Sequence, residues 1–306
     1  MTRTSAMGLF IVGCTSALAQ APVREGPLER LVLDSFADAK AWAVAEATVE
    51  PDGEHVKVGR SSLHFGIDVN WQTGEEKYPI GWPRTNRGFD EPWQRDWTAY
   101  DFFHFWVYAT TSRDSFPNEP LGLILYTPDK PRAYHRTLRE IRKDEWVEIR
   151  VPVEEIPRCN EVTRIQFFIS ESRYRHGDRL DFYVSDLALL RYAEPTLDYF
   201  AVGQKVTFAD ARFLPVRTRT FGIPRDGRTR VAFSVHRGGK ELATTVQQVG
   251  RGEETVWLDL GPKALAAGEY EVRAMLPGAR GPARMDTFRV VASPWQEPSL
   301  SRREPR

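Results

Sequence analysis

Hydrophobic residues recur at every second position along much of the chain. In segment 62–70, apolar Leu63, Phe65, Ile67 and Val69 alternate with polar or small residues. Side chains of a β-strand point to opposite faces in turn, so this period predicts strands with one buried face and one polar face.

Similar patterns, bounded by Gly, Pro, Asp or Asn, predict further strands in the first two thirds of the chain. These are 31–34, 102–109, 121–127, 146–151, 164–170 and 181–190. Helix signals are weak: the Ala-rich stretch 37–47 is short, and the charged stretch 134–143 is expected to be extended or a loop. Spaced short strands with little helix indicate an all-β protein.

A domain boundary is predicted near residues 192–197, where Pro195 follows a strand-like run. After it, seven short strands are predicted at 206–208, 218–221, 230–236, 240–247, 254–260, 268–275 and 285–291. Seven strands in roughly 95 residues are typical of an immunoglobulin-like sandwich. We therefore expect one domain at 28–192, a second at 198–293 and a flexible tail at 294–306, with each domain folding on its own.

Motifs spread along residues 28–192 resemble those of the galactose-binding-like jelly rolls found among carbohydrate-binding modules. They are Leu33–Phe36 with Trp42, Val58–Leu63, Tyr100–Tyr108, Trp146–Pro152 and Phe182–Leu187. Residues 267–274 resemble the G-x-Y-x-V pattern of bacterial immunoglobulin-like and fibronectin-like modules. The two resemblances imply a jelly-roll β-sandwich followed by an immunoglobulin-like β-sandwich.

The jelly-roll resemblance also implies a structural calcium ion near Asp34 and Asp186. Calcium takes six to eight oxygen ligands. Two carboxylates alone do not make such a site, and Ser185 stands where a second acid is usual. The alternative is that both aspartates bond to backbone turns, and no cofactor is required in either case.

Five of the nine tryptophans, Trp71, Trp82, Trp93, Trp97 and Trp106, fall within 36 residues of a stretch rich in Gly, Pro, Asp, Asn and Arg. A loop cannot easily bury several indoles, because its backbone polar groups need water. Exposed aromatic rings with polar neighbours mark binding sites, and sugars stack on such rings. The predicted partner is therefore a polysaccharide or other glycan.

Strand alternation selects the side chains that share this predicted surface. If Phe103, Leu123 and Phe167 face the core, their chain neighbours face outward. The candidate ligand-binding residues are Asp68, Asn70, Trp71, Trp82, His104, Trp106, Tyr126, Gln166, Glu171 and Arg173. The alternative is that the tryptophan-rich loop covers this face and that Trp106 and Phe168 form a minor core.

The balance of charge argues against nucleic acid as a partner. Lys plus Arg equals Asp plus Glu at 42 each, and no basic stripe is present, so nucleic acid is a poor partner. Residues 1–19 read as an export signal with a short apolar run, too short for a transmembrane span. The protein is expected to be secreted or periplasmic. Alternatively Ile11–Cys14 is a lipobox, and a lipid on Cys14 anchors the chain.

No catalytic residue is predicted. Glycoside hydrolysis needs two carboxylates that face one bond, and no such pair stands out. The first alternative is a polysaccharide hydrolase or lyase that uses His135 with Arg136, or Glu171 with Arg173 and His176, because a base beside a guanidinium suits an anionic sugar. The second alternative is a structural or interaction protein of the cell envelope. The preferred interpretation is a non-catalytic carbohydrate-binding protein.

Overall fold

The computed structural model describes residues 22–72, 80–278 and 282–295. The predicted export signal, Cys14 and residues 296–306 of the predicted tail lie outside this range. In the described residues the fold is all-β: strands β1 to β20, the four-residue helix α1 (Pro92–Arg95) and short 3-10 turns. None of the helices described is long and apolar enough to cross a membrane.

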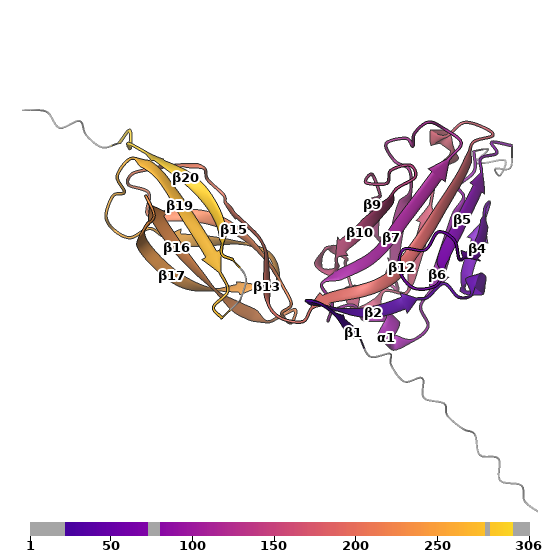
Figure 1. Cartoon of the computed structure of the whole chain (residues 1–306), viewed down its shortest axis with the longest axis horizontal. Coiled ribbons are helices and arrows are strands. Elements are labelled where there is room, and N and C mark those ends of the chain that lie inside the picture. The colour runs from indigo at the N-terminus through magenta and orange to yellow at the C-terminus, as the bar shows by residue number, and fades with distance from the viewer. Residues whose placement is uncertain (1–21, 73–79, 279–281, 296–306) are drawn as a thin grey trace, which may run out of the picture.

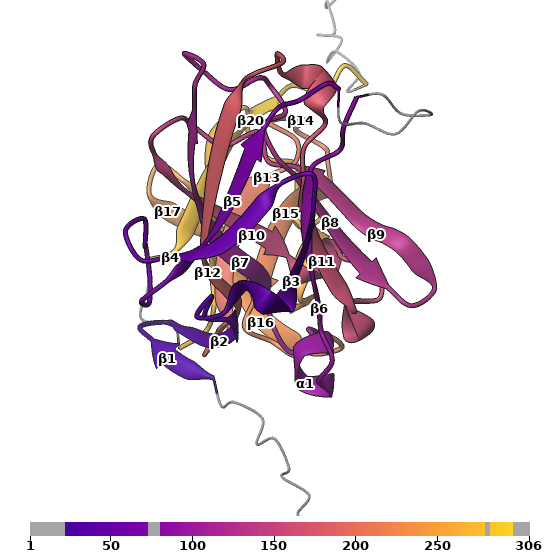
Figure 2. The ribbon, with the colours of Figure 1, turned by 90° about the vertical axis from the view of Figure 1, so that its right-hand side faces the viewer.

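Two sheets packed face to face form the first sandwich. The seven-stranded sheet contains β1 (Val23–Glu25), β2 (Leu28–Asp34), β4 (Thr48–Asp52), β5 (Ser62–Asp68), β7 (Phe102–Thr111), β10 (Trp146–Pro152) and β12 (Arg179–Tyr192). The five-stranded sheet has the order β3 (Trp42–Ala45), β6 (Arg84–Gly88), β11 (Arg164–Phe168), β8 (Gly122–Thr127) and β9 (Lys130–Thr137). Figure 2 shows the second of these sheets, with β9 at its edge.

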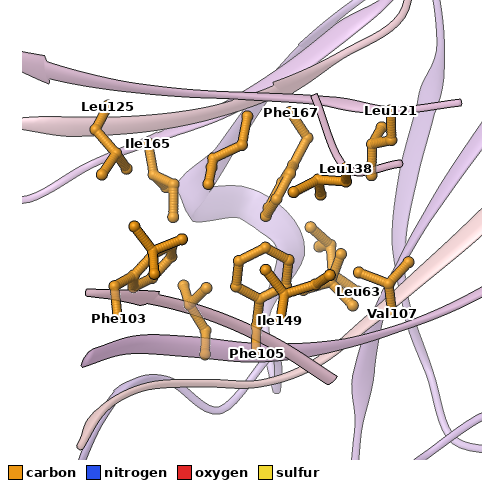
Figure 3. Packing of buried hydrophobic residues seen from close by; sticks show 14 of the residues in the cluster. Leu63, Phe103, Phe105, Val107, Leu121, Leu125, Leu138, Ile149, Ile165 and Phe167 are labelled. Carbon is orange, nitrogen blue, oxygen red and sulfur yellow. The ribbon is translucent and has the colours of Figure 1, made fainter. Parts of the chain in front are cut away.

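The core of this sandwich lies between the two sheets, as the alternating pattern predicts. Figure 3 shows the two layers facing each other: Phe103, Phe105 and Ile149 from one sheet, and Ile165 and Phe167 from the other. All five side chains are 0% exposed. Buried apolar side chains of this size dominate the stability of a domain, because each removes a large area from water.

Three strands of the five-stranded sheet lie where alternation does not predict them. β3 follows a 3-10 turn in the Ala-rich stretch, β6 reads Arg-Thr-Asn-Arg-Gly, and β9 begins before the charged stretch expected to be extended or a loop. Their strand conformation comes from pairing: β6 pairs with β3 and β11, and β9 pairs with β8. Backbone hydrogen bonds to a neighbouring strand override weak local propensity.

The second sandwich has eight strands rather than the seven predicted. They are β13 (Thr196–Val202), β14 (Val206–Phe208), β15 (Phe213–Phe221), β16 (Arg228–Arg237), β17 (Lys240–Gly250), β18 (Gly252–Asp259), β19 (Gly268–Met275) and β20 (Arg284–Val291). They form a three-stranded sheet, β13-β15-β18, and a five-stranded sheet, β14-β20-β19-β16-β17, around a separate core. The additional strand, β13, begins inside the segment predicted as the domain boundary.

The two sandwiches meet at a joint with its own buried contacts, near the point where β12 runs into β13 (Figure 1). Phe102, Leu190 and Phe221 pack together there. The carboxylate of Asp101 accepts hydrogen bonds from the N–H groups of Tyr192 at 2.8 Å and Gly222 at 3.1 Å.

Arg251 completes the polar part of the joint. Its Nε lies 3.2 Å from the Asp101 carboxylate, and its guanidinium also donates to the carbonyls of Thr98 and Tyr100. The side chains of Asp101 and Arg251 are only 2% and 6% exposed. The joint is therefore a packed interface with a buried ion pair.

Candidate functional site

The outward side chains predicted by alternation lie on two different faces of the first sandwich. Tyr126 and Gln166 stand on the outer face of the five-stranded sheet, on β8 and β11. His104 and Trp106 belong to β7 in the opposite sheet. The ten candidates therefore do not form one surface, because alternation gives the face of each strand but not the sheet to which the strand belongs.

A groove of about 680 Å³ lies over the outer face of the five-stranded sheet. This volume is within the usual range for sites that bind small molecules. Its lining includes three of the ten candidates, and most of the other lining residues are polar or basic. The residues are Glu46, Ile80, Gly81, Trp82, Arg84, Asn86, Tyr126, Arg132, Arg164, Gln166 and Ser170. We call this hollow the sheet groove.

Gln166 forms the centre of the groove floor. The strand register places it between Asn86 on β6 and Ile124 on β8. Its Oε1 accepts a hydrogen bond of 3.0 Å from the Tyr126 hydroxyl. The side chain is 4% exposed, and its Nε2 has no hydrogen-bond partner within the described ranges. An unpaired buried amide donor is costly, so a ligand acceptor that reached this nitrogen, after the side chains covering it move aside, would gain affinity.

The aromatic end of the groove is built around Trp82. Its ring meets the ring of Phe168 edge to face at 5.3 Å, and Phe168 in turn lies against Gly122. A β-carbon at position 122 would come within 2.2 Å of the Phe168 ring, so only glycine allows this close approach. The arrangement fixes the position of the indole.

Guanidinium groups cover both aromatic rings that face the groove. Arg132 lies over the Trp82 ring at 4.7 Å, and Arg84 is 5.9 Å from the same ring. Arg164 lies over the Tyr126 ring at 3.8 Å. The expectation of an open indole platform at Trp82 is therefore wrong, because cation–π contacts occupy the ring.

Glu46 supplies the carboxylate of the groove. It accepts the backbone N–H of Trp82 at 2.6 Å and lies 3.9 Å from Arg84. Sequence reasoning missed Glu46, Asn86 and the three arginines. Of these residues, only Arg164 has a sequence signal: it stands two residues from Gln166 on one strand, so the two side chains share a face.

Glu171 supports the groove rather than facing a ligand. It is 1% exposed, and its two carboxylate oxygens each accept a 3.0 Å hydrogen bond, one from the N–H of Asn70 and one from that of Gly81. The Trp71 indole donates to the backbone carbonyl of Glu171 at 3.3 Å. A carboxylate enclosed in this way cannot reach a ligand, and its placement among the ligand-binding residues is wrong.

The remaining loop candidates lie away from the sheet groove. Asp68 is exposed at the end of β5, opposite Arg179 in the sheet register. Trp71 is 42% exposed at the loop end of the sandwich. Arg173 pairs with Glu119 in a different hollow of about 870 Å³.

His104 and Trp106 are covered on the outer face of the seven-stranded sheet. His104 is 3% exposed, with Nε2 3.0 Å from Glu148 and Nδ1 3.3 Å from Asp186. The Trp106 ring lies under the ammonium of Lys57 at 4.8 Å. Both ring nitrogens of His104 already face carboxylates of the protein, and the residue does not line the sheet groove, which contradicts its predicted contact with a ligand there.

Basic groups stand where the implied calcium would bind. Asp34 accepts hydrogen bonds from Arg87 and from the Trp42 indole, and Asp186 accepts them from Arg30. No cluster of three or more His, Cys, Asp or Glu suited to a metal occurs in the residues described. These carboxylates do not fit calcium, because guanidinium groups already neutralise them.

The pKa of Asp186 reflects this pairing. Burial alone would raise it, but the neighbouring His104 side chain and the hydrogen bonds and positive charge of Arg30 outweigh burial and hold the pKa below its usual value. Asp186 is therefore an ionised structural carboxylate at neutral pH.

The residues named for the catalytic alternative are separated. Arg136 is paired with Glu140, and its Nη1 donates to the Arg150 carbonyl at 3.1 Å. His135 lies 5.5 Å from the Phe168 ring, near the aromatic end of the groove. His176 accepts the backbone N–H of Trp71 at 3.3 Å, near the loop end of the sandwich. Neither predicted set places its base and guanidinium together on the groove.

Comparison with known proteins gives only distant likenesses. No protein-family model matches the chain, and no curated protein matches its sequence. Among solved structures, a beta-1,2-glucanase from Parabacteroides distasonis is similar at a TM-score of 0.37 and 11% identity, covering 83% of this chain and 36% of the glucanase. An exo-beta-agarase is similar at a TM-score of 0.38 and 8% identity. The likeness covers 61% of this chain and 27% of the agarase.

A third similar structure is the CBM27-1 module of Caldicellulosiruptor saccharolyticus in complex with mannohexaose. Its TM-score is 0.32 and its identity 10%, over 53% of this chain and 95% of the module. The chain spans about a third of the glucanase and about a quarter of the agarase. Likeness at TM-scores below 0.5 assigns neither a fold nor a function to this chain.

Proposed function

We propose that the protein binds a glycan in the sheet groove without cleaving it. The observation that carries the proposal is the Gln166 amide, which lies on the groove floor with its Nε2 unpaired among the described residues. Once the side chains covering this donor move aside, a sugar hydroxyl can accept from it and donate to a nearby amide oxygen, such as that of Asn86.

The shape and lining of the groove also support a glycan. Ile80 and the edge of Trp82 supply apolar surface for the C–H faces of a sugar, while Asn86, Tyr126 and Gln166 supply polar groups. A mostly preformed concave site with few polar groups at fixed positions is typical of ligand binding. Gln166 and its Tyr126 partner are held by strand register, so little ordering is needed on binding.

The carboxylates near the groove are held by structural hydrogen bonds, which supports binding without cleavage. Glu46 accepts the N–H of Trp82, and both oxygens of Glu171 accept backbone N–H groups. A glycosidase needs one carboxylic acid to protonate the leaving group and a second carboxylate to act on the other side of the bond. Structural hydrogen bonds that fix both glutamates favour a supporting role for them.

Binding to a panel of neutral and acidic polysaccharides in affinity gels tests the proposal. Gln166→Leu removes the amide at nearly constant volume, and Gln248→Leu, on the exposed side of β17, is the matched control. We expect Gln166→Leu to abolish retention and Gln248→Leu to leave it unchanged. Equal retention of both variants, or no retention of the wild type by any glycan, would exclude this site.

The same samples test for catalysis. Incubation with each polysaccharide should release no new reducing ends and no unsaturated products. Release that survives purification and disappears in His135→Ala would favour the hydrolase or lyase alternative, since His135 lies at the end of the groove.

We also propose that the protein acts outside the cytoplasm, on the basis of the leader-like residues 1–19. Sequencing the amino terminus of the exported chain tests this location. A start at Gln20 fits a free protein, whereas a lipidated start at Cys14 fits an anchored one. Retention of an uncleaved chain in the cytoplasm would refute export.

A further inference from the structure

We propose that the glycan bound in the sheet groove is acidic, and that Arg132 and Arg164 bind its anionic groups. This inference rests on the proposed function. It follows from the way the groove uses its aromatic rings: they hold guanidinium groups in place instead of lying open to a neutral sugar.

The rings orient these arginines. Arg132 packs on the Trp82 ring at 4.7 Å, and Arg164 packs on the Tyr126 ring at 3.8 Å. Stacking on a ring satisfies the face of a guanidinium but leaves the N–H groups along its edge free to donate. Since both arginines line the groove, those donors are available to a ligand within it.

The charge of these two arginines is not neutralised by the protein. Arg84 is the arginine of the groove with an acidic neighbour, Glu46 at 3.9 Å. For Arg132 and Arg164, no carboxylate within ion-pair distance and no hydrogen bond is found among the residues described. Elsewhere on this sandwich arginines meet acids, as Arg87 meets Asp34.

This positive charge is local to the groove. The whole chain has equal numbers of acidic and basic residues, so general attraction to polyanions is not expected. The groove itself carries three arginines and one glutamate. A planar guanidinium edge matches the paired oxygens of a carboxylate or a sulfate ester, and the two arginines could contact anions on separate sugar units.

Isothermal titration of the full chain tests this inference with three polymers: a polyuronate, a sulfated dextran and unmodified dextran. The variants are Arg132→Gln, Arg164→Gln and the double variant. Arg60→Gln is the control, because Arg60 is exposed on the same sandwich in the loop between β4 and β5, outside the groove. Thermal unfolding of each variant checks that it is folded.

We expect the wild type to bind at least one acidic polymer at least about tenfold more tightly than unmodified dextran, because charge-assisted hydrogen bonds are about twice as strong as neutral ones. The polymer that is bound identifies the anion as carboxylate or sulfate. The double variant should lose at least about tenfold in affinity for that polymer. Binding should weaken as salt rises, and Arg60→Gln should behave as the wild type.

Two results would overturn the inference, and they differ from failure of the proposed function. Equal affinity for dextran and the acidic polymers, still abolished by Gln166→Leu, would leave a glycan site that ignores charge. An equal loss of affinity in Arg60→Gln and in the double variant would show that the attraction is not local to the groove. Absence of binding to any polymer would refute both proposals together.

Discussion

Replacing Asp101 with alanine should disrupt the joint between the two sandwiches. The Asp101 carboxylate is the acceptor for two backbone N–H groups, those of Tyr192 and Gly222, and faces the Arg251 guanidinium at 3.2 Å. Asp101→Ala leaves these three donors without their partner. Both side chains of the ion pair are almost fully buried, at 2% exposure for Asp101 and 6% for Arg251.

The expected cost is about 3–5 kcal/mol in the free energy of unfolding, the usual result of removing one partner of a buried ion pair. An orphaned backbone N–H costs about 1–3 kcal/mol, but these penalties overlap and do not add. Arg251 keeps its bonds to the carbonyls of Thr98 and Tyr100, which favours the lower part of the range.

The pKa of Asp101 helps to predict the stability of a variant that lacks both Asp101 and Arg251. Burial raises this pKa, and the hydrogen bond from Tyr192 and the charge of Arg251 offset only part of the effect. The ionised carboxylate is therefore costly to bury, and the pair is stable only as a unit. Asp101→Ala combined with Arg251→Met should be less destabilising than the sum of the two single variants by at least about 1 kcal/mol.

Urea unfolding of the full chain at pH 7, followed by circular dichroism, measures these differences. The control is Asp198→Ala, which breaks the Asp198–Arg219 pair of 2.7 Å on the second sandwich. The side chains of that pair are 28% and 38% exposed, so its loss should cost only about 0–1 kcal/mol. If Asp101→Ala costs no more than this control, the ion pair at the joint is not formed as described.

The other predictions concern packing, backbone, pH and binding. Phe167→Ala should cost about 3–5 kcal/mol in urea unfolding, because it empties a fully buried site between the sheets. Gly222→Ala should be clearly more destabilising than Gly26→Ala in thermal unfolding: both have positive φ, but only at Gly222 would a β-carbon lie 2.3 Å from a backbone carbonyl, that of Glu194. Asp186 has a lowered pKa in the folded state, so its ionised form adds stability above its unfolded pKa of about 3.9, and this stability is lost as pH falls through the folded pKa. The stability deficit of Asp186→Asn should therefore be large at pH 7 and shrink near pH 3. Trp82→Ala should weaken glycan binding by about 1–3 kcal/mol, measured by titration. Fragments 28–192 and 198–293, expressed separately, should each fold, with the first less stable than in the full chain because Phe102 and Leu190 lose Phe221.

Much of the first sandwich was predictable from alternation. Strands such as β5, β7 and β8 direct alternate side chains into the core, and the position of a side chain in the pattern predicted the face it occupies: Phe105 faces the core, and Gln166 on β11 faces outward. The reason is local, since the period of two is a property of the extended backbone itself.

Strands without an apolar face were not predictable in the same way. β6 and β9 carry mainly polar and basic residues, yet they supply Arg84, Asn86 and Arg132 to the groove. β6 depends on hydrogen bonds to β11, which is distant in sequence, and β9 depends on its hairpin pairing with β8. A binding face made of polar strands therefore gives little sequence signal of its own.

The sequence by itself determined that this protein is all-β, and it determined which side chains of its apolar strands point inward. Only the tertiary structure decided which strands share a sheet, and so separated His104 and Trp106 from Tyr126 and Gln166. It also decided that Glu171 is enclosed by backbone donors and that arginines cover the groove rings. The physical reason is that alternation is set within one strand, whereas sheet membership, burial of a charge and ring stacking depend on residues far apart in the chain.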